Sequence, residues 1–250
     1  LVQHVVAGGV DFLVALGSTG EAAMLDDEER RRVVEIVSAH RGKATLVIGT
    51  GTSATASTCT ATRIAADSGA DGALIAVPPY IKPTQAGIVA HFAAVAKAVP
   101  ELPLIAYNVP SRTGVNLTPE TMQRLWKLPT VVALKESSGD LNQISRIGAE
   151  LPDGRTLLAG DDALALASIA VGAHGLVSVA GNVVPSAMRE LLAAARGSDL
   201  TRAQEQLSVL LPLMNALNLE PNPIPIKAAL ALAGMTYSTP RLPLLPANDE

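Results

Sequence analysis

A lysine set in an apolar run is the residue of this chain whose surroundings most favour chemistry. Lys135 lies in the run VVALKES at residues 131–137, which is typical of a buried β-strand. An ammonium group among aliphatic side chains loses hydration, and this favours the neutral amine, which can attack a ketone. The alternative is a structural lysine that reaches water or a neighbouring carboxylate at a strand end. The other lysines lie in polar, turn-like or helical segments: Lys43, Lys82, Lys97, Lys127 and Lys227.

A glycine-flanked pair of hydroxyls is the second candidate. Residues 17–21 read GSTGE after an apolar run, so Ser18 and Thr19 stand at the end of a predicted strand. Backbone N–H groups and hydroxyls in such a loop can bind an anion, a carboxylate as readily as a phosphate. The alternative is a structural turn in which the same residues serve only the backbone.

The third candidate is the segment YNVPSRTG at residues 107–114. Tyr107 ends an apolar run, Arg112 follows in a proline-containing loop, and Tyr80 ends another predicted strand. A tyrosine at a strand end can serve packing alone. Beside Lys135, however, a hydroxyl for proton transfer and a loop for a carboxylate are the partners that imine chemistry on a keto acid requires.

Short apolar runs alternate with helical segments along the chain, a pattern that predicts a parallel sheet covered by helices. The predicted strands are residues 12–16, 45–48, 72–77, 104–107, 131–135, 156–159 and 175–179. The predicted helices between them are residues 27–40, 54–67, 85–98, 119–127, 141–151 and 162–171. Residues 185–196, 200–219 and 223–234 are predicted to be helical as well.

Polar and glycine-rich residues gather just after these strands, as they do at the C-terminal face of a (β/α)8 barrel. A doubly wound sheet would place function at one switch point, and no GxGxxG motif follows a strand. We therefore expect a TIM barrel over residues 1–182 with strands 2 to 8 visible, and an incomplete helical extension over residues 183–250. Residues 1–10 read as the end of a helix, so the first barrel strand is expected to be missing from this chain.

Composition narrows the partners and the compartment. The formal net charge of −4 and the mixed signs of residues 28–32 argue against nucleic acid and anionic membranes as partners. No run reaches the 18 or so apolar residues of a membrane span. A single cysteine, Cys59, excludes an internal disulfide framework and a cysteine-based metal site, and this indicates a cytoplasmic protein.

Six motifs together resemble the dihydrodipicolinate synthase family of pyruvate-dependent class I aldolases. They are GSTGE (17–21), YNVPSRTG (107–114), ALKESSGD (133–140), GDDALAL (160–166), GAHGLVSV (172–179) and EPNPIPIK (220–227). They occur in family order and at family spacing, and the resemblance runs from residue 1 to about 246. It implies a (β/α)8 barrel with a helical C-terminal extension, and a lyase that condenses pyruvate with L-aspartate 4-semialdehyde in the diaminopimelate route to lysine.

The resemblance also implies a mechanism that uses no metal and no organic cofactor. Lys135 forms an imine with pyruvate, and Tyr107 moves protons, relayed by Ser18 and by Tyr80 of a neighbouring subunit. Tyr80 acting across an interface requires an oligomer, which in this family is usually a homotetramer built as a dimer of dimers. Ser18 departs from the family's usual threonine but keeps the hydroxyl.

The substrate-binding positions that the resemblance implies are Thr19, Arg112, Val177 and Gly160. Thr19 holds the pyruvate carboxylate, Arg112 is the handle for the semialdehyde carboxylate, and Val177 offers its backbone carbonyl near the ketone. N-acetylneuraminate lyase and 2-keto-3-deoxygluconate aldolase share the tyrosine and the lysine but generally lack the SRTG stretch that contains Arg112.

Three alternatives remain beside the synthase. A sister aldolase of these two types uses the same imine chemistry, and the serine at position 18 is common there. The glycines around residues 172–181 also fit an aldolase of phosphorylated sugars, because many barrels bind phosphate at this place. A catalytically silent barrel that acts as a regulator or scaffold is the third. His174 is expected to be structural, and Asp161 and Asp162 to cap a helix.

Overall fold

The structure, a computed structural model, describes residues 1–248 and contains two compact units. One unit is the continuous segment from Val47 to Val177. The other combines residues 1–46 with the chain from Ser178 onward. The strands are hydrogen-bonded in chain order from β1 to β7, so each strand lies beside the next one in the sequence. This order is the one predicted from the alternation of strands and helices.

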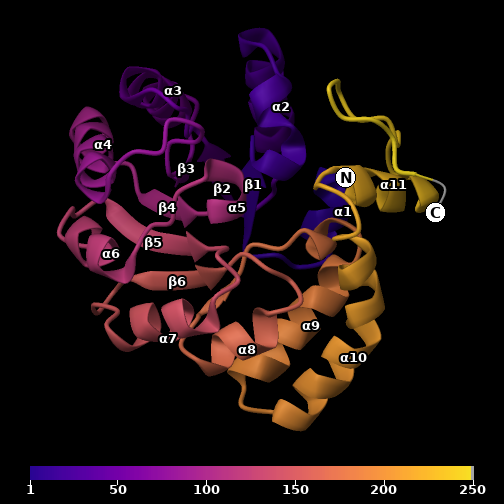
Figure 1. Cartoon of the computed structure of the whole chain (residues 1–250). Coiled ribbons are helices and arrows are strands. Elements are labelled where there is room, and N and C mark those ends of the chain that lie inside the picture. The colour runs from indigo at the N-terminus through magenta and orange to yellow at the C-terminus, as the bar shows by residue number, and fades with distance from the viewer. Residues whose placement is uncertain (249–250) are drawn as a thin grey trace. The chain divides into compact units, whose positions relative to one another are not determined.

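The unit of residues 47–177 is a parallel sheet with helices between its strands. Figure 1 shows helices α3, α4, α6 and α7 outside the strands of this unit. Its strands are β2 (Thr45–Gly49, the last three residues in this unit), β3 (Gly72–Ala76), β4 (Leu104–Asn108), β5 (Val131–Glu136), β6 (Thr156–Ala159) and β7 (Gly175–Leu176). Its helices are α3 (Thr55–Asp67), α4 (Gln85–Ala98), α5 (Pro110–Thr113), α6 (Pro119–Leu125), α7 (Leu141–Ala149) and α8 (Ala165–Ala170).

Local sequence signals set where these helices begin. Thr84, Thr118 and Asp140 precede α4, α6 and α7, and each side chain accepts a hydrogen bond from an N–H group of the first turn. Such caps satisfy donors that the helix itself cannot pair. Pro119 occupies the first position of α6, where a missing N–H costs nothing. The positions of these cap residues in the sequence therefore set where the helices start.

Aliphatic side chains between the sheet and its helices form the core of this unit. Ile75, Leu104, Leu134 and Leu157 come from neighbouring strands, and Phe92 comes from α4; all are fully buried. Strands buried on both faces are read as continuous apolar runs, which is why these segments showed no alternation of polar and apolar residues. The polar positions of β4 and β5 are confined to their last two residues in each case, next to the loops.

A β-bulge adjusts the register between β4 and β5. Leu104 pairs with Val131, but the next residue, Ile105, pairs with Ala133, so one residue of β5 has no partner in β4. From that point the register continues to the pair Tyr107 and Lys135. Because side chains alternate between the faces of a strand, an uncorrected register would have set Tyr107 opposite an apolar leucine. The bulge thus brings the predicted acid–base residue level with the predicted nucleophile.

The second unit contains strand β1, the N-terminal helices and the C-terminal helices. The backbone N–H of Thr45 donates to the carbonyl of Asp11, just before β1 (Phe12–Ala15). Helix α2 begins with a capping box between Asp26 and Glu29. Figure 1 shows α9 and α10 packed side by side in the C-terminal part. The remaining elements are α1 (Val2–Ala7), η1 (Ser18–Gly20), η2 (Ala22–Met24), α2 (Asp27–His40), η3 (Ala180–Asn182), α9 (Pro185–Arg196), α10 (Leu200–Ala216) and α11 (Ile224–Leu232).

The predicted strands and helices are found, although several bounds differ by up to three residues: the predicted helix 162–171 is α8 (Ala165–Ala170), and the predicted helix 200–219 is α10 (Leu200–Ala216). Three other differences stand out. The strand predicted at 175–179 is only two residues long, β7, because the chain leaves the sheet after Leu176. The N-cap position of α8 is Leu164 rather than Asp161 or Asp162, and Asp161 accepts a hydrogen bond from the Ala163 N–H at 3.1 Å. Helix α5 and the three 3-10 turns were not predicted. No helix within residues 1–248 has both the length and the apolar character to cross a membrane.

Candidate active site

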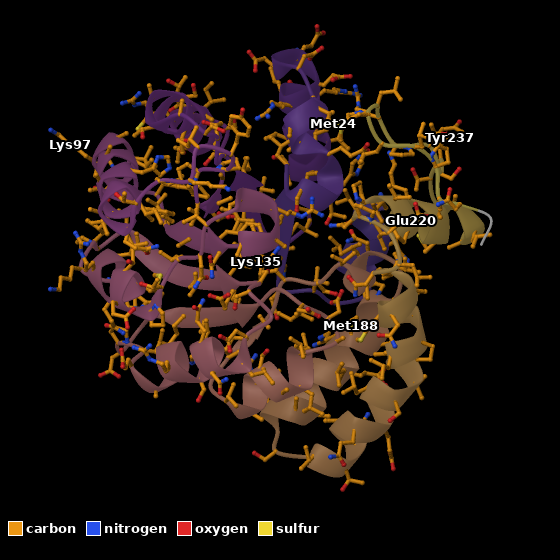
Figure 2. The ribbon with its side chains drawn as sticks, viewed as in Figure 1. Met24, Lys97, Lys135, Met188, Glu220 and Tyr237 are labelled. Carbon is orange, nitrogen blue, oxygen red and sulfur yellow. The ribbon has the colours of Figure 1, made fainter. Side chains whose placement is uncertain are left out.

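Lys135 and Tyr107 form the centre of the candidate site. They are register partners on the neighbouring strands β5 and β4, near the ends at which both strands leave the sheet. The Lys135 Nζ lies 4.2 Å from the centroid of the Tyr107 ring, a distance at which the ring face attracts a cation. Tyr107 is buried and Lys135 is half-buried. Figure 2 labels Lys135 at this end of the strands.

Gly160 and Ser137 enclose the other side of the lysine. A Cβ atom placed on Gly160 would lie 2.9 Å from the Lys135 Cε and 1.8 Å from the Ser137 Oγ. A larger residue at position 160 would have to displace the Ser137 hydroxyl and the Lys135 side chain, because both atoms occupy the space that its Cβ would need. The Lys135 side chain therefore runs between Tyr107 on one side and the glycine after β6 on the other.

A second pair of residues continues the ladder one step beyond Lys135 and Tyr107. Asn108 and Glu136 are register partners, and both are buried, with Glu136 only 1% exposed. The Asn108 Nδ2 donates to both oxygens of Glu136 at 3.0 Å. The backbone N–H of Ser138 donates to the same carboxylate at 2.7 Å. These bonds tie together the ends of the two strands that carry the lysine and the tyrosine.

The network around Glu136 contains amides rather than cations. The Gln143 Nε2 of helix α7 donates to Glu136 at 3.1 Å, and the Asn108 Oδ1 accepts from the Leu117 N–H at 2.8 Å. Burial raises the pKa of Glu136 above its ordinary value, and the hydrogen bonds from Asn108, Ser138 and Gln143 oppose this shift only in part. Sequence reasoning missed this network. Strand alternation carried the signal, since the polar residues Asn108 and Glu136 directly follow the two residues chosen as catalytic.

Arg112 and Tyr80 lie on adjoining segments of the same unit. Arg112 is exposed on the short helix α5, after Pro110. The backbone N–H of Tyr80 donates to the carbonyl of Thr113 at 3.3 Å, which links the two segments. Tyr80 and Lys82 have φ values of 71° and 47°, which lie in a backbone region that residues other than glycine rarely adopt. The Tyr80 side chain is 89% exposed and so is directed away from its own unit.

The GSTGE loop belongs to the other unit. Ser18 and Thr19 form the 3-10 turn η1 with Gly20, and both are half-buried. The Thr19 Oγ1 accepts a hydrogen bond of 2.9 Å from the Nδ2 of Asn222, a residue of the C-terminal segment. This contact ties the loop to the motif EPNPIPIK, to which sequence reasoning had assigned no role.

Glu21 of the same loop forms an ion pair that sequence reasoning also missed. It is 8% exposed and has a left-handed backbone with φ 55°. The Lys227 Nζ lies 2.5 Å from one carboxylate oxygen, and the backbone N–H of Arg241 donates to the other at 2.6 Å. Burial alone would raise the pKa of Glu21. The Arg241 N–H and the Lys227 ammonium outweigh it, and the pKa lies below its ordinary value.

The structure thus brings Lys135, Tyr107 and Gly160 together in one unit. Val177 directly follows β7, the strand next to β6, and its N–H donates to the carbonyl of Ala159 at 2.9 Å. Ser18 and Thr19 form part of a loop in the other unit. Among residues 1–248, no three His, Cys, Asp or Glu side chains are grouped so that they could hold a metal ion.

Comparison with known proteins agrees with these features. The model of the dihydrodipicolinate synthetase family matches residues 1–250. This chain belongs to that family. A curated relative from Thermosynechococcus vestitus, named 4-hydroxy-tetrahydrodipicolinate synthase, is 48% identical over 250 residues, which cover all of this chain and 84% of the relative. A relative of the same name from Thermomicrobium roseum is 46% identical over 254 residues, all of this chain and 84% of its own length.

Solved structures of the family have the same fold. Dihydrodipicolinate synthase from Aquifex aeolicus is 40% identical, with a TM-score of 0.95 over 99% of this chain and 85% of that one. The enzyme from Acinetobacter baumannii, solved in complex with pyruvate, is 38% identical, with a TM-score of 0.96 over 99% of this chain and 85% of that one. The predicted TIM-barrel class with C-terminal helices is therefore confirmed for this family member. The roles of its individual site residues stay predictions, as does the division at residue 182.

Proposed function

We propose that this chain condenses pyruvate with L-aspartate 4-semialdehyde, the reaction of 4-hydroxy-tetrahydrodipicolinate synthase in the diaminopimelate route to lysine. The observation that carries the proposal is the pairing of Lys135 with Tyr107 at the strand ends, with the lysine Nζ held against the tyrosine ring. Its curated relatives bear the name of this enzyme, and the related structure from Acinetobacter baumannii contains pyruvate. No nucleic acid or membrane partner is proposed.

Lys135 acts as the nucleophile. Its neutral amine attacks the ketone carbon of pyruvate, and loss of water gives an imine between the lysine nitrogen and that carbon. Loss of a methyl proton turns the imine into an enamine, whose carbon attacks the aldehyde of the second substrate. The amine of the second substrate then displaces the lysine by cyclisation, and the enzyme returns to its starting state.

Tyr107 moves the protons of these steps through its hydroxyl; the 4.2 Å between its ring centroid and the Lys135 Nζ supports this role by placing the two side chains next to each other. Ser18 relays protons to it, and Thr19 holds the pyruvate carboxylate with its hydroxyl and backbone N–H. Thr19 is already held in place by the hydrogen bond from Asn222. Gly160 gives the lysine side chain its space, and the Val177 carbonyl faces the ketone.

Arg112 selects the second substrate. Arg112 is exposed on α5, which begins shortly after Tyr107 in the sequence, and there its guanidinium can pair with the carboxylate of the semialdehyde. This contact distinguishes the synthase from sister aldolases of the N-acetylneuraminate and 2-keto-3-deoxygluconate types, which act on other aldehydes.

Tyr80 completes the relay in a neighbouring subunit of a homotetramer. Its 89% exposed side chain leaves its own unit, and the hydrogen bond to Thr113 holds its backbone in place. An exposed aromatic side chain next to the exposed Ile81 is typical of a contact with another chain. We place the enzyme in the cytoplasm, which agrees with its single free cysteine, Cys59.

Borohydride trapping tests the central step. Incubation with pyruvate and borohydride should add a reduced pyruvate adduct to Lys135, seen by peptide mass spectrometry. Lys135→Ala should abolish the adduct. Lys97→Ala is the matched control, since Lys97 is exposed on the outer helix α4, away from Lys135 (Figure 2), and should leave the adduct unchanged. An adduct on another lysine would overturn the assignment.

Steady-state kinetics test substrate choice. Product formation should be seen with aspartate semialdehyde and not with N-acetylmannosamine or glyceraldehyde. Tyr107→Phe should reduce turnover by about 10²-fold or more with little change in pyruvate affinity. Arg112→Ala should raise the KM for the semialdehyde by about 10-fold, because a charge-assisted contact is lost. Unchanged semialdehyde kinetics in Arg112→Ala would favour a sister aldolase.

Mixed oligomers test the position of Tyr80. Tyr80→Phe and Lys135→Ala subunits should each be nearly inactive alone. After the two are unfolded and refolded together, some sites contain an intact lysine from one subunit and an intact tyrosine from the other. Recovery of activity in the mixture is expected if Tyr80 acts across an interface, whereas no recovery would place its role within its own chain.

A further inference from the structure

The hydroxyl of Ser137 lies next to the reacting lysine and takes no part in the fold. Ser137 follows Glu136 at the end of β5, and its N–H still donates to the Asn108 carbonyl at 2.8 Å, so the strand geometry continues through it. Side chains two residues apart on a strand share a face. The Ser137 hydroxyl is therefore on the same face as the Lys135 amine.

Contacts with Gly160 fix the place of this hydroxyl. The Ser137 Oγ and the Lys135 Cε lie 1.8 Å and 2.9 Å from a single point, the position of a Cβ on Gly160. Two atoms that close to one point are neighbours. The Lys135 Nζ continues from Cε toward the Tyr107 ring. A group bonded to Nζ thus has Tyr107 on its β4 side and the Ser137 hydroxyl on its β6 side.

The Ser137 Oγ is buried, yet it has no hydrogen-bond partner within residues 1–248. Buried hydroxyls in folded proteins are nearly always paired, because an unpaired one loses its hydrogen bonds to water without replacing them. Neither the strand nor the neighbouring Glu136 network uses it. The Ser137 hydroxyl therefore has a free donor and lies directly beside Lys135. It is suited to bind the substrate that reacts with this lysine.

We propose that the Ser137 hydroxyl donates a hydrogen bond to the ketone oxygen of pyruvate while Lys135 adds to it. This inference rests on the proposed imine chemistry of Lys135. As the N–C bond forms, the C=O electron pair moves to the oxygen, which then takes the proton released by nitrogen to give a carbinolamine. That oxygen takes a second proton from Tyr107 and leaves as water while the C=N bond forms, and Tyr107 regains the remaining proton of the nitrogen. Ser137 only donates a hydrogen bond and ends each cycle with its own proton.

A donor aimed at an oxygen that gains charge in the transition state speeds the step without changing its end point. The finished imine no longer carries the oxygen. Ser137 should thus affect how fast the imine forms and leave its final amount alone, whereas a change that displaced Lys135 would reduce both. The same two quantities distinguish a purely structural serine: removal of its unpaired hydroxyl would change neither the rate of imine formation nor the final amount of imine.

The rate of imine formation tests this role. The full chain is mixed with saturating pyruvate, quenched with borohydride at set times, and the Lys135 adduct is measured by mass spectrometry. Ser137→Ala should form the adduct about 10-fold more slowly, with an unchanged final amount and unchanged half-saturating pyruvate. Ser137→Cys, which has a weak donor in a side chain of the same length, should also be slow. Both variants should unfold at the wild-type temperature or above.

Ser138→Ala is the matched control. It removes a hydroxyl one residue away, which accepts a hydrogen bond of 3.2 Å from the Asp140 N–H instead of lying on the lysine face. Its adduct should form at the wild-type rate. The role of Ser137 would be overturned if Ser137→Ala formed the adduct at the wild-type rate. It would also be overturned if the variant needed more pyruvate for half saturation but kept the wild-type limiting rate. Absence of any adduct in the wild-type chain would instead overturn the proposed function.

Discussion

Two buried carboxylates, Glu21 in the GSTGE loop and Glu136 after the lysine, are treated in opposite ways by the regions around them. Both are less than a tenth exposed. Glu21 accepts a hydrogen bond from the Arg241 N–H and has the ammonium of Lys227 at 2.5 Å, and together these lower its pKa. Within residues 1–248, the donors to Glu136 are the neutral groups of Asn108, Ser138 and Gln143, and burial raises its pKa. Burial is thus outweighed at Glu21, where a backbone N–H and a cation act together, and it prevails at Glu136, where all the donors are neutral.

The difference fits the work of each region. The Glu21 pair joins residues more than 200 positions apart in the chain, so it fastens the C-terminal segment to a loop that is proposed to hold a carboxylate. Glu136 lies one residue from Lys135, and its amide partners Asn108 and Gln143 hold the end of β5 to β4 and to α7.

The largest effect is expected from the amide network. Asn108→Ala removes the donor to Glu136 and the acceptor for the Leu117 N–H, and it leaves both groups buried and partly unpaired. We expect a loss of about 3 kcal/mol in the free energy of unfolding, measured by urea denaturation. Asn142→Ala, the same change at an exposed position of α7, is the control and should cost much less. Equal losses in the two variants would show that the network contributes nothing special.

The next effect should come from the cation in the other region. Lys227→Met removes the ammonium that contacts the buried Glu21 carboxylate and leaves the N–H and the charge of Arg241. We expect a loss of about 2 kcal/mol in the free energy of unfolding, a value limited by the partial exposure of Lys227 to solvent. Lys97→Met on the exposed face of α4 is the control. If Lys227→Met were neutral at pH 7, the ion pair would have no stabilising role.

Opposite pH dependences are the sharpest test of the comparison, although each change is smaller. The lowered pKa of Glu21 gives stability that is present above its ordinary value of 4.5 and lost as pH falls through the folded pKa. The raised pKa of Glu136 does the reverse, so stability falls as pH rises from 4.5 through the folded pKa. Relative to wild type, Glu21→Gln should therefore lose stability with rising pH, and Glu136→Gln should gain it.

Thermal unfolding between about pH 3 and pH 8 measures these two slopes. If both variants changed in the same direction with pH, the two carboxylates would have similar environments and the comparison would fail.

The smallest effect is expected at an exposed carboxylate with a cation partner. Glu120 receives a hydrogen bond from Arg146 at 2.7 Å, which lowers its pKa to about 2. Both side chains are more than half exposed, so water and salt screen the pair. Glu120→Gln should leave the melting temperature at pH 7 unchanged within error. A clear drop would show that a short ion pair stabilises this protein even without burial.

The sequence by itself determined the order of strands and helices and the residue most suited to be the nucleophile. Long apolar runs with polar residues only at their ends predict buried parallel strands, and a lysine within such a run stands out because its burial is costly. In the motif YNVPSRTG, Tyr107 was chosen because it ends an apolar run, and Arg112 because it follows in a proline-containing loop. These inferences are local, since they depend on the period and polarity of segments a few residues long.

Only the tertiary structure decided which of these residues meet. The bulge between β4 and β5 aligns Tyr107 with Lys135, and no local pattern reports a register shift between strands that are 20 or more residues apart. The contact of Ser137 with Gly160 depends on two different strands in the same way. Glu21 and Lys227 lie at opposite ends of the chain, so their pairing and the sign of the Glu21 pKa shift follow from packing alone. Residue types were readable from the sequence, but distances between non-local partners come only from the folded backbone.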